Sequence, residues 1–209
     1  MAHKVHPKIF RIGETETWDS RWFSLSRYRK NLREDLKIRE ILDKEVEKTI
    51  IEKVEIERLG NKINIIIKTP KPGVLIGKGG QGAEALANKI AKVIKGKEIK
   101  IDVEEIRDPY TSASLLASQI AADLERRVPY KSAVKRAIRR ALERKGIKGI
   151  KVKIKGRLDG AEIARDETFK HGKMPLQTIR AYIDYGESRA YCSYGVVGVK
   201  VWLYKGQKI

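Results

Sequence analysis

The front half of the chain changes between helical and strand-like spacing of its hydrophobic residues. In residues 27–48, leucine, isoleucine and valine recur at helical spacing among alternating charges, which predicts an amphipathic helix. Residues 50–58 alternate apolar and charged positions, and residues 62–69 are rich in isoleucine, which predicts two strands. Gly60 and Asn61 supply a turn between them, so the two strands are expected to form a hairpin.

Prolines and glycines interrupt this pattern after the second predicted strand. Pro70 and Pro72 stop the strand, and residues 73–76 are at least as compatible with a single helical turn as with a further strand. A glycine-rich loop follows, and the spacing then predicts a helix over residues 83–95 and a third strand over residues 99–106. The expected order is helix, strand, strand, short helix, glycine loop, helix, strand.

The rear half begins after a boundary at Asp108-Pro109. Its spacing predicts two helices, broken at Val128-Pro129, and then three strands. The helices are expected over residues 112–127 and 131–145, and the strands over residues 147–156, 177–185 and 191–204. Residues 157–175, which are rich in glycine and charge, are expected to connect the first two strands.

These elements predict an α+β fold with two small domains. Residues 1–27 look irregular and are expected to be an N-terminal extension. Residues 28–108, with a core of about residues 39–107, are expected to form a mixed sheet with helices. Residues 109–209 are expected to pack two helices on a mainly antiparallel sheet. Three aromatic residues of the extension are expected to anchor it onto something larger: Trp18, Trp22 and Phe23.

The distribution of positive charge indicates what kind of partner the protein binds. The 209 residues include 46 Lys and Arg against 27 Asp and Glu, a net charge of +19. Residues 126–157 hold fourteen bases and one acid, Glu143, and so carry +13 of this excess. Charge concentrated in this way indicates a polyanionic partner, whereas a merely solvated surface would spread it evenly.

Other chemistries find little support. Cys192 is the only cysteine, which excludes an intramolecular disulfide and a cysteine metal cluster. His3 and His6 have the spacing of a metal pair but no third ligand nearby in the sequence, so no metal and no cofactor are expected. The first residues lack the apolar core of a signal peptide, and no segment approaches the length of a membrane span. We expect a cytoplasmic protein with no membrane partner and no small-molecule substrate.

A glycine-lysine loop at residues 72–82 partly matches the motifs of two kinds of nucleotide-binding site, a dinucleotide site and a nucleoside-triphosphate loop. Gly77, Gly79 and Gly82 fit the dinucleotide pattern G-x-G-x-x-G, and Asp102 lies twenty residues further on, about where a ribose-binding acid would be. However, the proline break removes the strand that should precede such a loop, and the upstream strands are expected to be antiparallel. A nucleoside-triphosphate loop also fails, because its spacing is one residue short and Gly79 replaces the hydroxyl residue.

A third chemistry is an RNA backbone clamp formed by Gly77, Lys78, Gly79 and Gly80. A GxxG turn between two helices lets the backbone approach an RNA phosphate, and the next helix N-terminus supplies N–H groups. Lys78 adds a cation. The element order and the sequence V-L-I-G at residues 74–77 resemble a KH domain of the second type. A glycine turn with a purely structural role stays open as the alternative.

The expected helix over residues 131–145 combines an apolar stripe with a row of cations. Its apolar residues fall on one face: Val134, Ala137, Ile138, Ala141 and Leu142. Cations recur at four-residue steps, about 6 Å apart along one side, and almost no acids relieve their repulsion. The cations expected to contact RNA on and before this helix are Arg126, Arg127, Lys131, Lys135, Arg136, Arg139, Arg140 and Arg144.

Five motifs spread over nearly the whole chain resemble the small-subunit ribosomal protein S-three family of the bacterial type. They are K-V-H-P at residues 4–7, L-E-R-R at 124–127, G-R-L-D-G-A-E-I-A-R at 156–165, R-A-Y-I-D-Y at 180–185 and Y-G-V-V-G-V-K-V-W at 194–202. Together they are far more specific than GxxG alone. The chain is therefore identified as a member of that family, with a type-two KH domain at residues 28–108 and a ribosomal domain at residues 109–209.

The resemblance implies a non-enzymatic constituent of the small-subunit head. Such a protein binds ribosomal RNA, contacts neighbouring head proteins and contacts messenger RNA where it enters the subunit, helping to position and unwind it. In the family, basic residues on the helix hold the incoming messenger, and the matching positions here are Lys131, Ser132 and Lys135. Ser132 replaces the usual arginine, so Arg136 or Arg139 is a candidate to compensate.

The ribosomal RNA contacts implied in the long connection are Arg157 and Arg165. Two other functions are considered. A nucleotide-dependent enzyme would use the glycine loop, which the loop spacing disfavours. A free-standing KH regulator would need neither the N-terminal extension nor the motif at residues 156–165.

Overall fold

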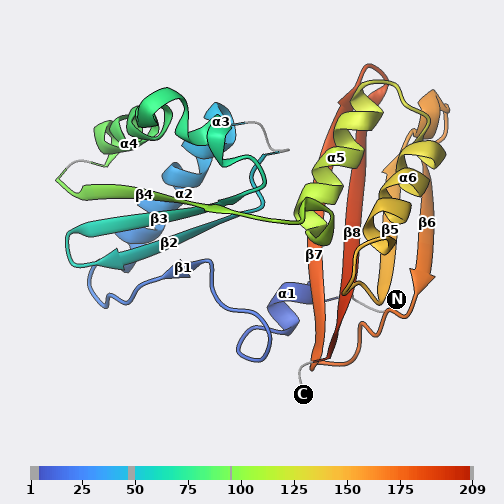
Figure 1. Ribbon diagram of the computed structural model, residues 1–209, viewed down its shortest axis with the longest axis horizontal. Helices are drawn as coiled ribbons and strands as arrows, with labels where there is room; N and C mark the ends of the chain where they lie inside the picture. The colour runs from blue at the N-terminus through green and yellow to red at the C-terminus, as the bar shows by residue number, and fades with distance from the viewer. Residues whose placement is uncertain (1–4, 47–49, 95, 208–209) are drawn as a thin grey trace. The chain divides into compact units, whose positions relative to one another are not determined.

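The computed structural model describes residues 5–46, 50–94 and 96–207 (Figure 1). They form two compact units: a front unit within residues 18–107, and a rear unit of residues 5–17 and 108–207. The predicted α+β class with two small domains is confirmed. The domain boundaries given above stay a prediction, and the two units divide the expected extension after Thr17.

The front unit contains a four-stranded mixed sheet in the order β1-β2-β3-β4. Its strands are β1 (Ser20–Arg21), β2 (Lys53–Leu59), β3 (Lys62–Thr69) and β4 (Glu98–Glu105). β2 and β3 form the expected antiparallel hairpin, whereas β1 pairs with β2, and β3 with β4, in parallel. The helices are α2 (Tyr28–Glu45), α3 (Pro72–Ile76) and α4 (Gln81–Val93). They share one core with the isoleucines of β2 and β3, and the predicted element order is confirmed.

Charged groups with little exposure join α2, β2 and the segment before α2. Asp35, 2% exposed, accepts hydrogen bonds from the Trp22 indole N–H at 2.7 Å and the Arg58 Nε at 2.9 Å. Glu34 accepts from Arg58 and Lys97, each at 2.7 Å. Burial alone would raise the pKa of Glu34, but these two hydrogen bonds and their charges hold that pKa below its usual range. Trp22 therefore anchors its segment within the front unit.

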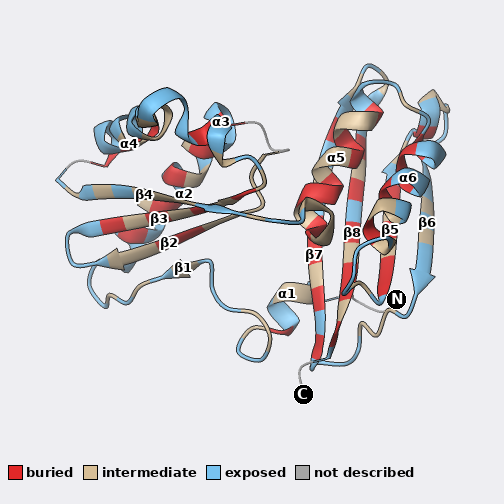
Figure 2. Ribbon diagram, viewed as in Figure 1, coloured by how far each residue is buried: buried red, intermediate tan, exposed pale blue. Residues whose placement is uncertain are grey.

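The rear unit contains a four-stranded antiparallel sheet in the order β6-β5-β8-β7. Its strands are β5 (Gly149–Gly156), β6 (Arg165–Gly172), β7 (Ala181–Cys192) and β8 (Gly195–Gln207). Helices α5 (Ala113–Glu125) and α6 (Tyr130–Leu142) lie side by side on one face of the sheet (Figure 1). Buried and more exposed residues alternate along β5 and β8 (Figure 2), because successive strand residues point to opposite faces.

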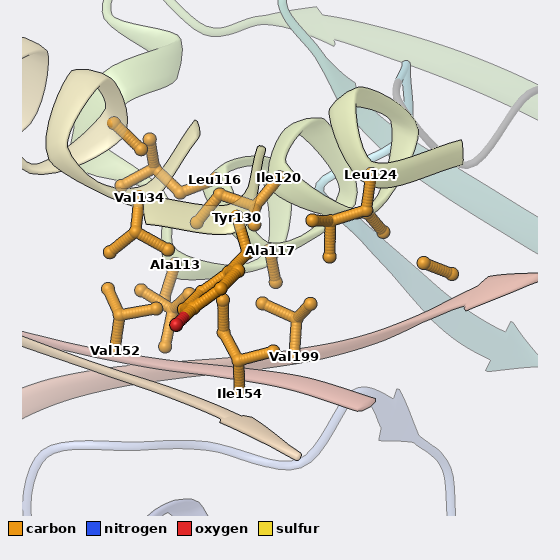
Figure 3. Close-up of a cluster of buried hydrophobic side chains, with 14 of the residues drawn as sticks. Ala113, Leu116, Ala117, Ile120, Leu124, Tyr130, Val134, Val152, Ile154 and Val199 are labelled. Carbon is orange, nitrogen blue, oxygen red and sulfur yellow. The ribbon is translucent and has the colours of Figure 1, made fainter. Parts of the chain in front are cut away.

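The main core of the rear unit lies between these helices and the sheet (Figure 3). Leu116 and Ile120 of α5 and Val134 of α6 pack with Val152 of β5 and Val199 of β8, and none of the five is more than 1% exposed. The predicted helices and the antiparallel character of the sheet are confirmed.

Strand β6 lies within residues 157–175, which were predicted to be a connection, so that prediction was wrong. Six of its eight residues are exposed, and only Glu167 and Phe169 are half-buried. An edge strand held by backbone pairing with β5 shows little of the hydrophobic alternation that sequence patterns detect. β7 also continues past its predicted end to Cys192, and β8 begins at Gly195 rather than at residue 191.

The N-terminal residues, expected to be irregular, contain α1 (Pro7–Phe10) and β1, and the arm of residues 5–17 is fixed to the rear unit by Arg11. Arg11 is 1% exposed. Its guanidinium donates to four backbone carbonyl oxygens at 2.8–3.1 Å, those of Pro7, Leu176, Thr178 and Ala181. Ala181 begins the edge strand β7, so one buried cation covers the start of that edge.

The N-terminus of α6 is held by two acidic residues that follow β5. The Asp159 carboxylate accepts from the Tyr130 backbone N–H at 3.2 Å, and the Tyr130 hydroxyl donates to Glu167 of β6 at 2.8 Å. The Tyr130 ring lies in the core (Figure 3). The first N–H groups of a helix have no partner inside it, and a carboxylate there also complements the helix dipole. The motif at residues 156–165 therefore positions α6.

We expect Arg11→Met to destabilise the rear unit by about 2–4 kcal/mol, because buried carbonyls lose a charged donor. Urea unfolding measures the loss, and amide hydrogen exchange locates it: exchange should accelerate in β7 and stay unchanged in β2 and β3. Ile9→Ala is the matched control, since Ile9 is on the same arm and 64% exposed. Unchanged exchange in β7 of the methionine variant would contradict the role of Arg11.

Asp159→Ala should lower the free energy of unfolding by about 1–2 kcal/mol, because the α6 N-terminus loses its acceptor. Asp159→Asn keeps an acceptor and tolerates the φ of +51° at this position, so it should retain most of the stability. Thermal unfolding of the three proteins tests this order. If the alanine variant were as stable as the unchanged chain, Asp159 would not cap α6.

Candidate nucleic-acid interface

The glycine loop of residues 77–80 connects α3 to α4 and requires glycine for its backbone. Gly77, Gly79 and Gly80 have φ values of +68°, +62° and +86°, which other residues rarely adopt. A Cβ on Gly79 or Gly80 would meet no atom within 4 Å, so the loop is open on its outer side. Helix α3 separates the loop from β3, so no strand delivers it as a dinucleotide site requires.

Gly82, the last glycine of the apparent dinucleotide pattern, has a packing role. A Cβ there would lie 2.6 Å from the backbone oxygen of Leu75, so glycine allows α4 to approach α3. Lys78 is exposed, and no acidic oxygen lies within 4 Å of its amine among the residues described. Helix α4 begins without a side-chain cap. An open backbone, a cation and uncapped N–H groups suit an RNA phosphate; the contact itself stays a prediction.

Three arginines predicted to contact RNA are engaged within the rear unit, two of them on α6 and Arg144 just after its end. Arg136 forms an ion pair with Asp123 of α5, with a distance of 2.8 Å. The guanidinium carbons of Arg140 and Arg144 lie 5.6 and 5.7 Å from the centre of the Tyr110 ring. Tyr110 belongs to the short helix η2 (Pro109–Thr111) that precedes α5. These arginines therefore hold α6 to its neighbours.

Lys131, Lys135 and Arg139 form a second group on α6, which we call the helix cations. All three are exposed, and in the described part of the chain none has an acidic oxygen within 4 Å. Two of them border a shallow groove of about 440 Å³, lined by Lys135, Ile138, Arg139, Leu142 and Glu143. Cations beside apolar side chains can hold phosphates while a base covers the apolar surface.

Arg127 ends α5 in a backbone conformation that favours glycine. Its φ is +62°, its N–H donates to the Leu124 oxygen at 2.9 Å, and the Val128 N–H donates to the Asp123 oxygen at 3.1 Å. Glycine is the usual residue at this position of a helix end, and a residue with a side chain costs about 1 kcal/mol there. Arg126 and Arg127 are both exposed, which places two cations just before α6.

Arg157 and Arg165, predicted together as loop contacts, have different surroundings. Arg157 donates to the backbone oxygens of Ala161 at 2.8 Å and Tyr194 at 3.2 Å, which ties the motif at residues 156–165 to the turn between β7 and β8. Arg165 is the exposed first residue of β6. Arg157 therefore orders the motif, and an RNA contact by either arginine stays a prediction.

The roles of Arg11 and Asp159 were not predicted, because both depend on partners distant in the sequence. His3 of the histidine pair and Lys4 of the first motif lie outside the described residues. Within those residues, no three His, Cys, Asp or Glu side chains gather as a metal site requires. None of the described helices combines the length and the apolar character needed to cross a membrane.

Comparison with known proteins gives matches over both units. The family model described as "KH domain" matches residues 37–111, and the one described as "Ribosomal protein S3, C-terminal domain" matches residues 120–203. Small ribosomal subunit protein uS3 of Caldicellulosiruptor saccharolyticus is 49% identical over 207 residues, which cover 99% of this chain and 93% of that protein. The uS3 protein of Magnetococcus marinus is 47% identical over 209 residues, covering 100% of this chain and 99% of that protein. The chain belongs to the small ribosomal subunit protein uS3 family.

Proposed function

We propose that this chain binds ribosomal RNA in the head of the small ribosomal subunit and that α6 holds messenger RNA where it enters the subunit. The uS3 family consists of structural ribosomal proteins rather than enzymes. Its members act in the ribosome, so ribosomal RNA is the expected partner and the cytoplasm the expected location. Contacts with messenger RNA and with neighbouring head proteins are more specific proposals than binding of ribosomal RNA.

The observation that carries the messenger contact is the row of helix cations beside the apolar groove. A single strand offers both phosphates and unstacked bases, whereas a duplex keeps its bases stacked inside. The groove therefore fits single-stranded RNA better than duplex RNA. Because α6 is fixed at its N-terminus by Asp159, the cations are held on a rigid support. A rigid surface that prefers the single strand would favour unwinding as messenger enters.

Ser132 stands where the resemblance leads us to expect an arginine. Of the two residues expected to compensate, Arg136 is paired with Asp123 at 2.8 Å. Arg139 has no acidic oxygen within 4 Å among the described residues. We therefore assign the compensating contact to Arg139.

The glycine loop is a second proposed RNA contact, through Lys78 and the backbone of residues 77–80. A free-standing KH regulator is the alternative function. The rear unit counts against it, because the Caldicellulosiruptor saccharolyticus relative is matched over 93% of its own length by a chain that contains both units.

We expect Lys135→Gln combined with Arg139→Gln to slow translation through a messenger hairpin in a reconstituted system, while translation of an unstructured messenger changes little. The matched control is Arg140→Gln with Arg144→Gln, which removes the same charge from the last turn of α6 and from just after its end, at positions engaged with Tyr110. Equal slowing by the two variants, or none by the first, would remove the support for the messenger contact.

Arg127→Gly should raise stability and weaken RNA binding together. The free energy of unfolding should increase by up to about 1 kcal/mol, because glycine relieves the strained helix end. The slope of log affinity against log salt should fall by about 1 if Arg127 contacts a phosphate. Thermal unfolding and titration with small-subunit ribosomal RNA measure the two effects. Unchanged affinity with raised stability would mean that Arg127 has no RNA contact.

A further inference from the structure

Helices α5 and α6 both cover the same face of the rear sheet. Ile150, Val152 and Ile154 of β5 point toward α5 and α6 and are 0% exposed. The residues between them must point to the opposite face, because side chains alternate along a strand. On β5 these are lysines in succession: Lys151, Lys153 and Lys155.

Strand pairing places further cations beside these lysines. Each β5 lysine and the residues opposite it on the other strands form one row across the sheet, and the rows are counted from Lys151. Lys170 of β6 lies directly opposite Lys151, and Lys200 of β8 directly opposite Lys153. Gly198 separates Lys155 from Arg189 of β7 in the third row. We call this group the open-face cations: Lys151, Lys153, Lys155, Lys170, Arg189 and Lys200. Neighbouring strands are about 4.8 Å apart, and alternate residues of one strand about 6.8 Å, so these cations form one contiguous surface.

Acidic neighbours neutralise only part of this surface. Asp166 pairs with Lys153 at 2.6 Å, and Glu187 with Lys200 at 3.5 Å. The amine of Lys170 and the guanidinium of Arg189 are exposed, as is Lys155, and within the described parts of the chain no acidic oxygen lies within 4 Å of any of the three.

Like charges directly opposite each other destabilise a sheet, so these pairs call for an explanation. The front sheet also has such a pair, Lys53 opposite Lys68, but there Glu55 lies 3.2 Å from each amine. An antiparallel sheet can expose one face to water, but such a face normally carries mixed charge. The rear sheet instead places two lysine pairs in adjacent rows. Residue pairs that destabilise the fold locally, such as these facing lysines, are typical of a binding surface.

An aromatic side chain lies beside the cations. Trp202 is half-buried between Lys151 and Tyr185 in the first row of the sheet, the row that contains Lys151. The Lys151 amine lies 5.2 Å from the centre of the Trp202 ring, and the Trp202 and Tyr185 rings are 5.3 Å apart. A tryptophan among lysines can stack on a nucleobase whose phosphates the lysines hold, which favours RNA over an acidic protein as the partner.

The other end of the same face is already occupied. Ala181, Ile183 and Tyr204 form a small apolar cluster with Met174 and Leu176. The arm covers this end through the four hydrogen bonds of Arg11, and His6 packs edge-on against Tyr185 with ring centres 4.7 Å apart. The arm thus closes the apolar end of the face and leaves the cationic end accessible.

We propose that the open-face cations, with Trp202, form a second RNA-binding surface of the rear unit, on the side of the sheet opposite the helix cations. The rear unit would then lie between two RNA segments, one on α6 and one on the sheet. This inference rests on the proposed RNA-binding function but does not require the messenger contact of α6.

The test measures binding of the full chain to in vitro transcribed bacterial small-subunit ribosomal RNA over a range of salt concentrations. The open-face variant carries Lys155→Gln, Lys170→Gln and Arg189→Gln, the three open-face cations for which the described residues show no acidic oxygen within 4 Å. We expect weaker binding and a fall of about 3 in the slope of log affinity against log salt. The control variant, Lys37→Gln, Lys62→Gln and Lys92→Gln, removes three exposed charges from the front unit and should change the slope by less than about 1.

The comparison with the Lys135→Gln, Arg139→Gln variant separates this inference from the proposed function. If only the helix variant binds RNA less tightly, the second surface does not exist and the proposed function stands. If neither variant binds less tightly, both are overturned.

A single substitution checks that lost binding is not lost folding. Lys170→Thr removes the repulsion with Lys151, so Tm should rise by about 1–3 °C while RNA affinity falls. A rise in Tm with unchanged affinity would show that the lysine row is only a solvated surface.

Discussion

Burial of the small apolar stripe of α6 against β5 determines where the rear unit can carry charge. The stripe consists of residues that are 0–6% exposed: Ala133, Val134, Ala137 and Ala141. Their short side chains let the helix backbone come close to the sheet. Since this stripe faces the sheet, Lys131, Lys135 and Arg139 must face away from it. The same contact faces Ile150, Val152 and Ile154 toward the helix and so turns the lysines of β5 to the opposite side.

This packing depends on the residues that fix the N-terminus of α6. Tyr130 contributes to it twice, with its ring in the core and its hydroxyl on Glu167 of β6. Asp159 closes the helix N-terminus, and Arg157 holds the segment that carries Asp159. The motif at residues 156–165 is therefore a structural element whose effect on RNA binding passes through the position of α6.

The sequence was sufficient for the front unit from α2 onward, because each of those elements carries a local signal, whereas the two-residue strand β1 carries none. The hairpin has a Gly60-Asn61 turn, and Pro70 and Pro72 separate β3 from the glycine loop, which was enough to set aside a dinucleotide site. Elements that depend on distant partners could not be found in this way. β6 has Phe169 as its single half-buried apolar residue, and Arg11 reaches acceptors 165–170 residues away. The lysine pairs of the open face exist only through the register of β5 with β6 and β8.

A count of basic residues does not separate cations that stabilise the fold from cations that bind a partner. Arg11 is buried and donates to four backbone carbonyls, so it is closed to RNA. Arg136 and Arg157 are exposed, but each uses part of its guanidinium on a carboxylate or on carbonyls of the fold. Lys135 and Lys170 have no such acidic neighbour within the described residues, and each lies next to other cations. Their mutual repulsion raises the free energy of the unbound protein and disappears when phosphates approach. A ligand that binds only the folded state also stabilises it. The basic surface of this chain therefore couples the stability of the protein to RNA binding. Repulsion between the cations destabilises the free protein, and its relief by the phosphates contributes to the free energy of binding.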